Sequence, residues 1–222
     1  MKAMLLAAGR RERMRPITDS LPKPLVPVAG RPLIAWHLGA LARANFREVV
    51  INTSWLAPQL HAALGDGSPW GVSISWSDEG QVPLETGGGI FRAVPLLGPG
   101  PFLVVNADIW TDIDFATLSL ENGAHAHLVL VPNPPHNSRG DFGLDGDLVV
   151  SRDADRFTYS GVGMFRREFF DGASGERFPL LPLLNRAIAA QRVRGELHRG
   201  AWSDVGTPER LAALDARLRA LQ

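Results

Sequence analysis

The sequence predicts an α/β fold with a mostly parallel, doubly wound sheet and a small antiparallel extension. Short apolar runs, such as residues 3–8 and 102–105, lack alternation, which is typical of strands covered on both faces. Segments with helical spacing of apolar residues separate these runs, as expected when parallel strands are joined by helices. In the second half of the chain, alternating strands that contain glycine replace this order and predict the antiparallel part.

The elements of the first half follow one another regularly. Gly9 ends the first strand at residues 3–8, and Pro32 is suited to the first turn of a helix. The positions at helical spacing after Pro32 are Leu33, Trp36, His37, Ala40, Leu41 and Ala44. Further strands are predicted at 49–52, 72–76 and 102–105, and further helices at 55–64 and 87–97.

The second half predicts strands at residues 125–131 and 157–165. Between them, residues 141–150 alternate and carry Gly143 and Gly146, which favours the arm of a hairpin. A helix is expected at 179–191. One face of a terminal helix is marked by Leu211, Leu214, Leu218 and Leu221. No repeat or linker interrupts the chain, so we expect one domain over residues 1–222.

Composition excludes several classes of protein. The 23 basic and 23 acidic residues cancel, which argues against a general binder of nucleic acid or of a membrane surface. The chain has no cysteine, so neither a disulfide nor a thiolate nucleophile is available. The N-terminus lacks a secretory signal pattern, and no apolar run reaches membrane-spanning length. We therefore expect a cytoplasmic protein, with no indication of its oligomeric state.

The first 27 residues combine a buried strand with a cationic loop. After Gly9 come four arginines within six positions, and Lys23 stands between two prolines. Open α/β sheets place binding sites beyond the ends of their strands, and arginine's forked donors suit phosphate groups. The flanking prolines stiffen the backbone around Lys23 and would fix the direction of its ammonium group. These features predict a site for a phosphorylated ligand.

The pattern L-x-A-G-x-x-x-R-M-x-P, followed by P-K-P, resembles the signature of the sugar-1-phosphate nucleotidylyltransferases. The likeness continues in LETGGGI (84–90), VNADIW (105–110), RGDF (139–142), YSGVGMF (159–165) and WSDVGTPER (202–210), and so covers nearly the whole chain. It is greatest to the small bacterial N-acetylmuramate-1-phosphate uridylyltransferases of cell-wall recycling. The resemblance implies a Rossmann-like fold of the nucleotide-diphospho-sugar transferase type, with no C-terminal repeat domain.

The implied reaction is attack by a sugar-1-phosphate oxygen on the α-phosphorus of a nucleoside triphosphate, with loss of pyrophosphate. The attacking oxygen is already ionised near neutral pH, so the task is to position two polyanions and neutralise charge. By resemblance, Arg13 acts on the leaving pyrophosphate and Lys23 holds the reacting phosphate. Asp108, directly after a buried strand, and Asp204 are implied as ligands of Mg²⁺, which prefers oxygen donors.

The resemblance also implies residues that bind each substrate. Glycines at the start of a helix allow the backbone to approach a base or ribose closely. Glu79 is a candidate acceptor for a pyrimidine N3–H, and it is equally well explained as a solvated carboxylate in a turn. The implied nucleotide-binding residues are Ala8, Gly9, Arg10, Arg11, Glu79, Gly87, Gly88 and Asn106. On the sugar side they are Asp141, Ser160 and Gly161, where Ser160 replaces an asparagine that is frequent in the family.

Three alternatives stay open. Another sugar or nucleotide is conceivable, such as mannose-1-phosphate with GTP or glucose-1-phosphate with dTTP. A non-catalytic binder of nucleotide or sugar phosphate is a further alternative, because Arg11 stands where the family usually has glycine. Arg13, Lys23, Asp108 and Asp204 argue against such a regulatory protein, since a pure binder has little use for two metal ligands. UTP is the expected nucleotide.

Overall fold

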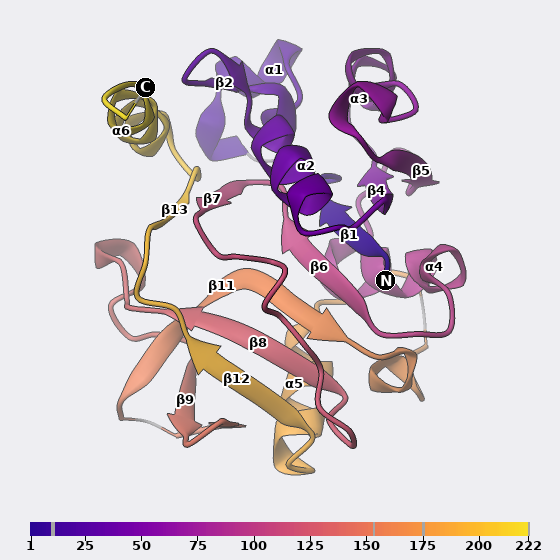
Figure 1. Ribbon diagram of the computed structural model, residues 1–222, viewed down its shortest axis with the longest axis vertical. Coiled ribbons are helices and arrows are strands. Elements are labelled where there is room, and N and C mark those ends of the chain that lie inside the picture. Colours follow the sequence, from indigo (N-terminus) through magenta and orange to yellow (C-terminus); the bar gives the residue numbers. More distant parts are fainter. Residues whose placement is uncertain (10–11, 153, 175, 222) are drawn as a thin grey trace.

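The computed structural model describes residues 1–9, 12–152, 154–174 and 176–221 (Figure 1). These residues include a nine-stranded sheet with the order β5-β4-β1-β6-β11-β8-β12-β10-β9. Its strands are β1 (Ala3–Leu6), β4 (Glu48–Thr53), β5 (Ser73–Asp78), β6 (Phe102–Asn106), β8 (Ala126–Val131), β9 (Phe142–Asp145), β10 (Leu148–Val150), β11 (Arg156–Phe165) and β12 (Val193–Leu197).

The sheet has a parallel half and a mixed half. Strands β5, β4, β1 and β6 are parallel to one another. Strand β11 then runs antiparallel to both β6 and β8, while β12 is parallel to β8, and β9 and β10 complete the far edge in antiparallel pairings. The predicted α/β class is confirmed. The antiparallel part is joined to the main sheet through β11, so it continues the same layer (Figure 1).

Helices cover both faces of the sheet. Apolar side chains of α2 (Leu33–Arg43) and α3 (Ala57–Leu64) share a buried cluster with Leu5 and Ile51. Those of α4 (Glu85–Leu97) and α5 (Leu181–Ala189) pack on the opposite side. Because neighbouring residues of a strand point to opposite faces, Met4 belongs to this second cluster. The burial of strands from both sides explains their unbroken apolar runs.

Short elements complete the chain. The N-terminal loop contains η1 (Glu12–Met14), α1 (Ile17–Ser20) and η2 (Lys23–Leu25), followed by the hairpin β2 (Pro27–Val28) and β3 (Arg31–Pro32). The other short helices are η3 (Ser68–Trp70), η4 (Pro135–Asn137) and η5 (Arg167–Phe170). The final helix α6 (Pro208–Arg219) packs through Leu214 and Leu218 against Met14 and Val28. Among the described residues, no helix combines the length and the apolar character needed to cross a bilayer.

A small second sheet was not predicted. Strand β7 (Ile109–Thr111) follows β6 after a turn and pairs antiparallel with β13 (Trp202–Asp204). Strand β12 and the β2–β3 hairpin were also missed, whereas the longer predicted strands and helices are all present. The β7–β13 pairing brings the end of the chain back beside the end of β6 (Figure 1).

Candidate active site

A cleft lies at the carboxyl ends of the parallel strands. In the sheet register, Leu6 at the end of β1 lies between Asn52 of β4 and Asn106 of β6. The predicted site residues that line the cleft are Ala8, Gly9, Lys23, Glu79, Asn106 and Asp108. Four polar or turn residues that the sequence had not marked also line it: Asn52, Pro83, Glu85 and Thr86. Loops beyond adjacent parallel strands therefore build the cleft together, as predicted.

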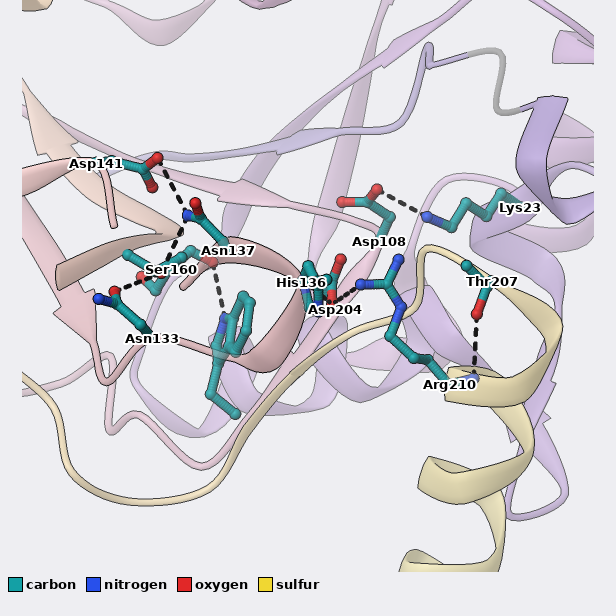
Figure 2. A network of polar contacts seen from close by, with 12 residues as sticks. Lys23, Asp108, Asn133, His136, Asn137, Asp141, Ser160, Asp204, Thr207 and Arg210 are labelled. Atoms are coloured by element: carbon teal, nitrogen blue, oxygen red, sulfur yellow. Dashed lines mark hydrogen bonds and ion pairs between the residues drawn. The ribbon is translucent and has the colours of Figure 1, made fainter. Parts of the chain in front are cut away.

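Lys23 and Asp108 form an ion pair inside this cleft. The Lys23 Nζ lies 2.8 Å from the Asp108 Oδ2. Only 3% of the lysine side chain and 18% of the aspartate side chain are exposed. Pro22 and Pro24 bracket the lysine, and η2 turns it inward at the point where the loop packs. The predicted phosphate-binding cation and one predicted metal ligand are thus in direct contact (Figure 2).

A buried histidine supports the backbone next to Asp108. The His37 Nε2 lies 2.7 Å from the carbonyl oxygen of Ile109, so this nitrogen carries the proton and donates it. Burial lowers the pKa of His37 to about 4, against smaller opposing effects of this hydrogen bond and of the Asp108 charge. His37 is therefore neutral near pH 7. Its sequence position had indicated only the packed face of a helix, so its contact with β7 was not foreseen.

The β7–β13 pairing joins Asp204 to Asp108. Ile109 lies opposite Asp204, and the Val205 N–H donates to the Asp108 carbonyl oxygen at 2.8 Å. The Asp204 Oδ1 in turn accepts from Arg210 Nη1 at 2.9 Å and lies 3.1 Å from His136 Nε2. Figure 2 shows this network, with Asp108 beside Lys23 and Asp204 between His136 and Arg210.

These two carboxylates are suited to Mg²⁺. The described residues contain no cluster of three or more His, Cys, Asp or Glu side chains arranged for a metal. Mg²⁺ at phosphoryl-transfer sites is nevertheless commonly held by one or two carboxylates and completed by substrate phosphates and water. Asp108, which lines the cleft, and Asp204 could supply that donor set, since the pairing of β7 with β13 brings their backbones together. The chemistry of these residues therefore fits the metal that the resemblance implies.

Both carboxylate oxygens of Glu79, the candidate acceptor for a pyrimidine, already accept hydrogen bonds from the protein. Its Oε1 accepts from Asn52 Nδ2 at 2.6 Å, and its Oε2 accepts from the Leu84 N–H at 2.7 Å. The Asn52 Oδ1 accepts from the Ala7 N–H at 2.6 Å. Burial raises the pKa of the Glu79 carboxyl, although the hydrogen bonds from Leu84 and Asn52 oppose that shift. Glu79 thus ties the end of β1 to the entrance of α4, as a brace of the cleft wall.

Side chains at the first glycines of α4 would collide with a neighbouring segment of the chain. The Gly88 N–H donates to the Phe178 carbonyl oxygen at 3.0 Å. A Cβ on Gly87 would lie 2.6 Å from the Phe178 ring, and one on Gly88 would overlap the Glu176 carbonyl oxygen. The Cβ positions of Gly87 and Gly88 thus face packed protein, and the expected approach of a base or ribose to their backbone stays a prediction. Both let the strap, which we define as residues 176–178, pack onto the start of the helix.

Gly161 and Asn106 form a close pair between β11 and β6. Gly161 has φ +82°, in the left-handed region, and a Cβ there would lie 2.6 Å from the Asn106 Nδ2. The strand register shifts between Tyr159 and Val162, which is a bulge at this point. Glycine is required here by both the backbone and the neighbouring amide. The contact holds Asn106, a residue that lines the cleft, at the border of the sugar-side extension.

The other two predicted sugar contacts are held inside the protein. Ser160 is fully buried, and its hydroxyl donates to the Val129 carbonyl oxygen at 2.6 Å. Asp141 accepts from the Tyr159 N–H at 2.8 Å and from Asn137 Nδ2 at 3.2 Å. The Ser160 hydroxyl has no exposed surface in this structure, and the expected contact of this residue with the sugar phosphate stays a prediction. Asp141 is half-buried and fixes η4 to β11 (Figure 2).

The arginines of the first loop differ in how they are placed. Arg13 lies in η1 with an exposed side chain, next to Met14, which is fully buried and anchors this turn. Arg10 and Arg11 lie outside the described residues. The predicted role of Arg13 on the leaving pyrophosphate therefore requires its exposed side chain to reach the cleft when substrates bind.

Known proteins resemble this chain over its whole length. A model of the Nucleotidyl transferase family matches residues 2–147. An N-acetylmuramate alpha-1-phosphate uridylyltransferase from Neisseria meningitidis is 52% identical, over 97% of each chain. One of the same name from Caulobacter vibrioides is 39% identical, over 97% of this chain and 96% of its own. A mannose-1-phosphate guanylyltransferase from Mycobacterium tuberculosis is 32% identical over 93% of this chain and 61% of its own.

Solved structures share the fold at low sequence identity. A crystal structure of a Bacillus anthracis protein in complex with sucrose has a TM-score of 0.87 at 18% identity, covering 100% of this chain and 96% of that one. HddC from Yersinia pseudotuberculosis, complexed with GMP-PN, has a TM-score of 0.78 at 18% identity and covers 98% and 99% of the two chains. The fold, the cleft and the relatives agree. The chain belongs to the nucleotidyl transferase family and is an enzyme, a nucleotidyltransferase.

Proposed function

We propose that this enzyme transfers a uridylyl group from UTP to N-acetylmuramate 1-phosphate, and that it requires Mg²⁺. The products are the UDP-sugar and pyrophosphate. The sugar and nucleotide are taken from the names of the two uridylyltransferases that match almost the full chain. The corresponding biological role is the recycling of cell-wall sugars in the cytoplasm.

One observation carries the chemical part of this proposal. Lys23 is paired with Asp108 inside the cleft, and the pairing of β7 with β13 brings the backbone of Asp204 beside that of Asp108. A buried cation and two carboxylates at strand ends supply what phosphoryl transfer needs, namely fixed charge and a place for a divalent metal. No nucleophilic side chain is required, because the sugar phosphate itself attacks.

Each group of the cleft then has a task. Lys23 orients the α-phosphate, and the exposed Arg13 receives the leaving pyrophosphate. Asp108 and Asp204 would hold a divalent metal, which would offset the negative charge of the phosphates. The backbone of Ala8 and Gly9, beyond β1, faces the nucleotide side of the cleft together with Asn106. Glu79 acts through Asn52 and Leu84 by keeping that wall in place.

Guanylyl transfer to mannose 1-phosphate is the second candidate. The Mycobacterium tuberculosis relative carries that name and matches 93% of this chain. Its lower identity of 32%, against 52% for the uridylyltransferase from Neisseria, favours the first candidate.

A substrate panel tests the proposal. Pyrophosphate release is measured with UTP, GTP, dTTP and CTP against the 1-phosphates of N-acetylmuramate, N-acetylglucosamine, glucose and mannose. We expect the highest kcat/KM for UTP with N-acetylmuramate 1-phosphate. An Asp108→Asn variant serves as the inactive control for contaminating enzymes. A higher kcat/KM for GTP with mannose 1-phosphate would reject the first candidate in favour of the second.

A further inference from the structure

Arg210 contacts the carboxylate of Asp204, a proposed metal ligand. It lies in the first turn of α6, and its Nη1 donates to the Asp204 Oδ1 at 2.9 Å. The arginine side chain is 21% exposed, so the contact is partly shielded from solvent. Guanidinium groups stay charged at all working pH values. The carboxylate therefore has a permanent cation beside it in this structure, as Asp108 has Lys23.

The surroundings of Arg210 leave part of its hydrogen-bonding capacity unused. Its Nε is buried and has no hydrogen-bond partner in the part of the chain that the structure describes. Gly206 provides the space for the guanidinium, because a Cβ at this position would overlap the Arg210 Nη2 and would lie 3.1 Å from the Asp204 Oδ2. A buried donor without a partner is costly, and a phosphate oxygen would satisfy it.

A divalent cation and Arg210 compete for the same carboxylate. A free cation that approaches Asp204 meets a positive charge already in contact with its ligand atom. A metal–triphosphate complex meets no such obstacle, because the triphosphate carries more negative charge than one divalent cation neutralises. Its spare phosphate oxygens would accept hydrogen bonds from the guanidinium, which would leave the Asp204 carboxylate available to a metal.

We propose that Arg210 is the counter-ion of Asp204 before substrates bind and moves its contact to a phosphate of the incoming nucleotide. Divalent metal then binds firmly only together with the triphosphate. This inference rests on the proposed function, in which Asp204 is a metal ligand. Arg210 thus positions the Asp204 carboxylate before substrates bind, and binds a phosphate group once the nucleotide is bound. His136, 3.1 Å from the same Asp204 oxygen, stays as a donor when Arg210 is replaced.

Metal binding without turnover tests the inference. Mn²⁺ is titrated into the full-length protein and followed by electron paramagnetic resonance, first alone and then with UTP but no sugar phosphate. UTP retention is measured separately by equilibrium dialysis in Mn²⁺. Arg210→Met should bind Mn²⁺ alone about tenfold or more tightly than wild type, and should bind UTP in Mn²⁺ about tenfold more weakly. Both affinities of Arg210→Lys should lie between those of the wild type and of Arg210→Met, because lysine keeps the positive charge but lacks the forked donors of the guanidinium.

The matched control is Arg219→Met on the same helix, which removes an arginine paired with Asp215 rather than with Asp204. It should leave both affinities unchanged. Unchanged or weaker binding of Mn²⁺ alone by both Arg210 variants would overturn the inference, and Arg210→Gln replaces Arg210→Met if the latter does not fold. Failure of the wild type to retain UTP in Mn²⁺ would instead reject the proposed function.

Discussion

Lys23 and Asp108 are separated by 85 positions in the sequence, yet the lysine Nζ lies 2.8 Å from the aspartate Oδ2. The two side chains come from different loops beyond the parallel strands, and both line the cleft. In the proposed reaction, the pair therefore couples the residue that would orient the reacting phosphate to a residue that would hold the metal. Stability and catalysis depend on it in different ways, and substitutions can separate the two.

Lys23→Met should lower kcat/KM by ~10²-fold or more, because the cation that faces the reacting phosphate is lost. It should also lower the free energy of unfolding by ~1–3 kcal/mol, since Asp108 keeps a largely shielded charge with one partner fewer. Lys23→Arg keeps the charge and should retain more activity than Lys23→Met. Urea unfolding and pyrophosphate release measure the two effects. The double variant Lys23→Met/Asp108→Asn should regain stability without regaining activity. If its stability does not recover, loss of the ion pair is not the cause of the lower unfolding free energy of Lys23→Met.

The two carboxylates should matter for turnover more than for folding. Asp108→Asn and Asp204→Asn keep the shape of each side chain but remove the charge that holds a divalent metal. We expect kcat to fall by ~10²-fold or more in each variant. Asp204→Asn should keep a thermal midpoint near that of the wild type, whereas Asp108→Asn should lose ~1–3 kcal/mol of unfolding free energy, because the buried Lys23 then has one partner fewer. Asp145→Asn, on the exposed hairpin of β9, is the control and should be fully active. A chelator should stop the wild-type enzyme, and added Mg²⁺ should restore it. Normal turnover of either site variant would exclude that residue as a metal ligand.

The glycines at the start of α4 allow a test of packing against ligand access. In Gly88→Ala, the new methyl group meets the Glu176 carbonyl oxygen of the strap. We expect a loss of ~1–3 kcal/mol in unfolding free energy from overpacking. Gly100→Ala is matched to it, since a Cβ there meets no atom within 4 Å, and it should change stability by less than about 0.5 kcal/mol. Unchanged stability in Gly88→Ala, together with a raised KM for UTP, would contradict the packing role and support the prediction that the nucleotide approaches this glycine.

His37 should make the fold sensitive to mild acid. Burial lowers its pKa from 6.5 to about 4 in the folded protein, so the unfolded chain takes up a proton at a higher pH than the folded one. The stability that neutral His37 supports is complete above pH 6.5 and is lost as the pH falls towards 4, by ~3 kcal/mol in all. His37→Gln keeps a donor for the Ile109 carbonyl without this titration, so its unfolding free energy should change less between about pH 7 and about pH 5. His125→Gln controls for the loss of a histidine. Equal pH dependence of wild type and His37→Gln would contradict the assignment.

The sequence predicted those parts of the molecule that depend on local pattern. Apolar runs buried on both faces identified β1 and β6, and the residues beyond them, Gly9 and Asp108, do line the cleft. The position of Lys23 between two prolines correctly indicated an inward, fixed side chain. Such signals work because each depends on neighbouring residues and on a rule of strand or turn geometry.

Contacts between distant segments could not be read in this way. Strands β7 and β13 are three residues each, too short to show a period, and 90 residues separate Thr111 from the Ala201 oxygen that its hydroxyl meets. The triple glycine indicated close approach of a ligand. In the structure, the strap, a segment far along the chain, packs where side chains at Gly87 and Gly88 would lie. Ser160 stands where the family often has asparagine and was expected to contact the sugar. In the structure, at the bulge in β11, its hydroxyl donates to the Val129 carbonyl oxygen inside the sheet. In each case tertiary packing decided the role of a residue whose type alone was ambiguous.

The central claim is that this protein catalyses nucleotidyl transfer from UTP to N-acetylmuramate 1-phosphate. The most direct test is ³¹P nuclear magnetic resonance of wild-type protein with both substrates and Mg²⁺. Our account predicts that the triphosphate and monoester signals disappear together while pyrophosphate and a sugar diphosphodiester appear in equal amounts, with no change in the Asp108→Asn control. Broadened substrate signals that show binding, with neither product formed after long incubation, would contradict it and would favour a regulatory binding protein.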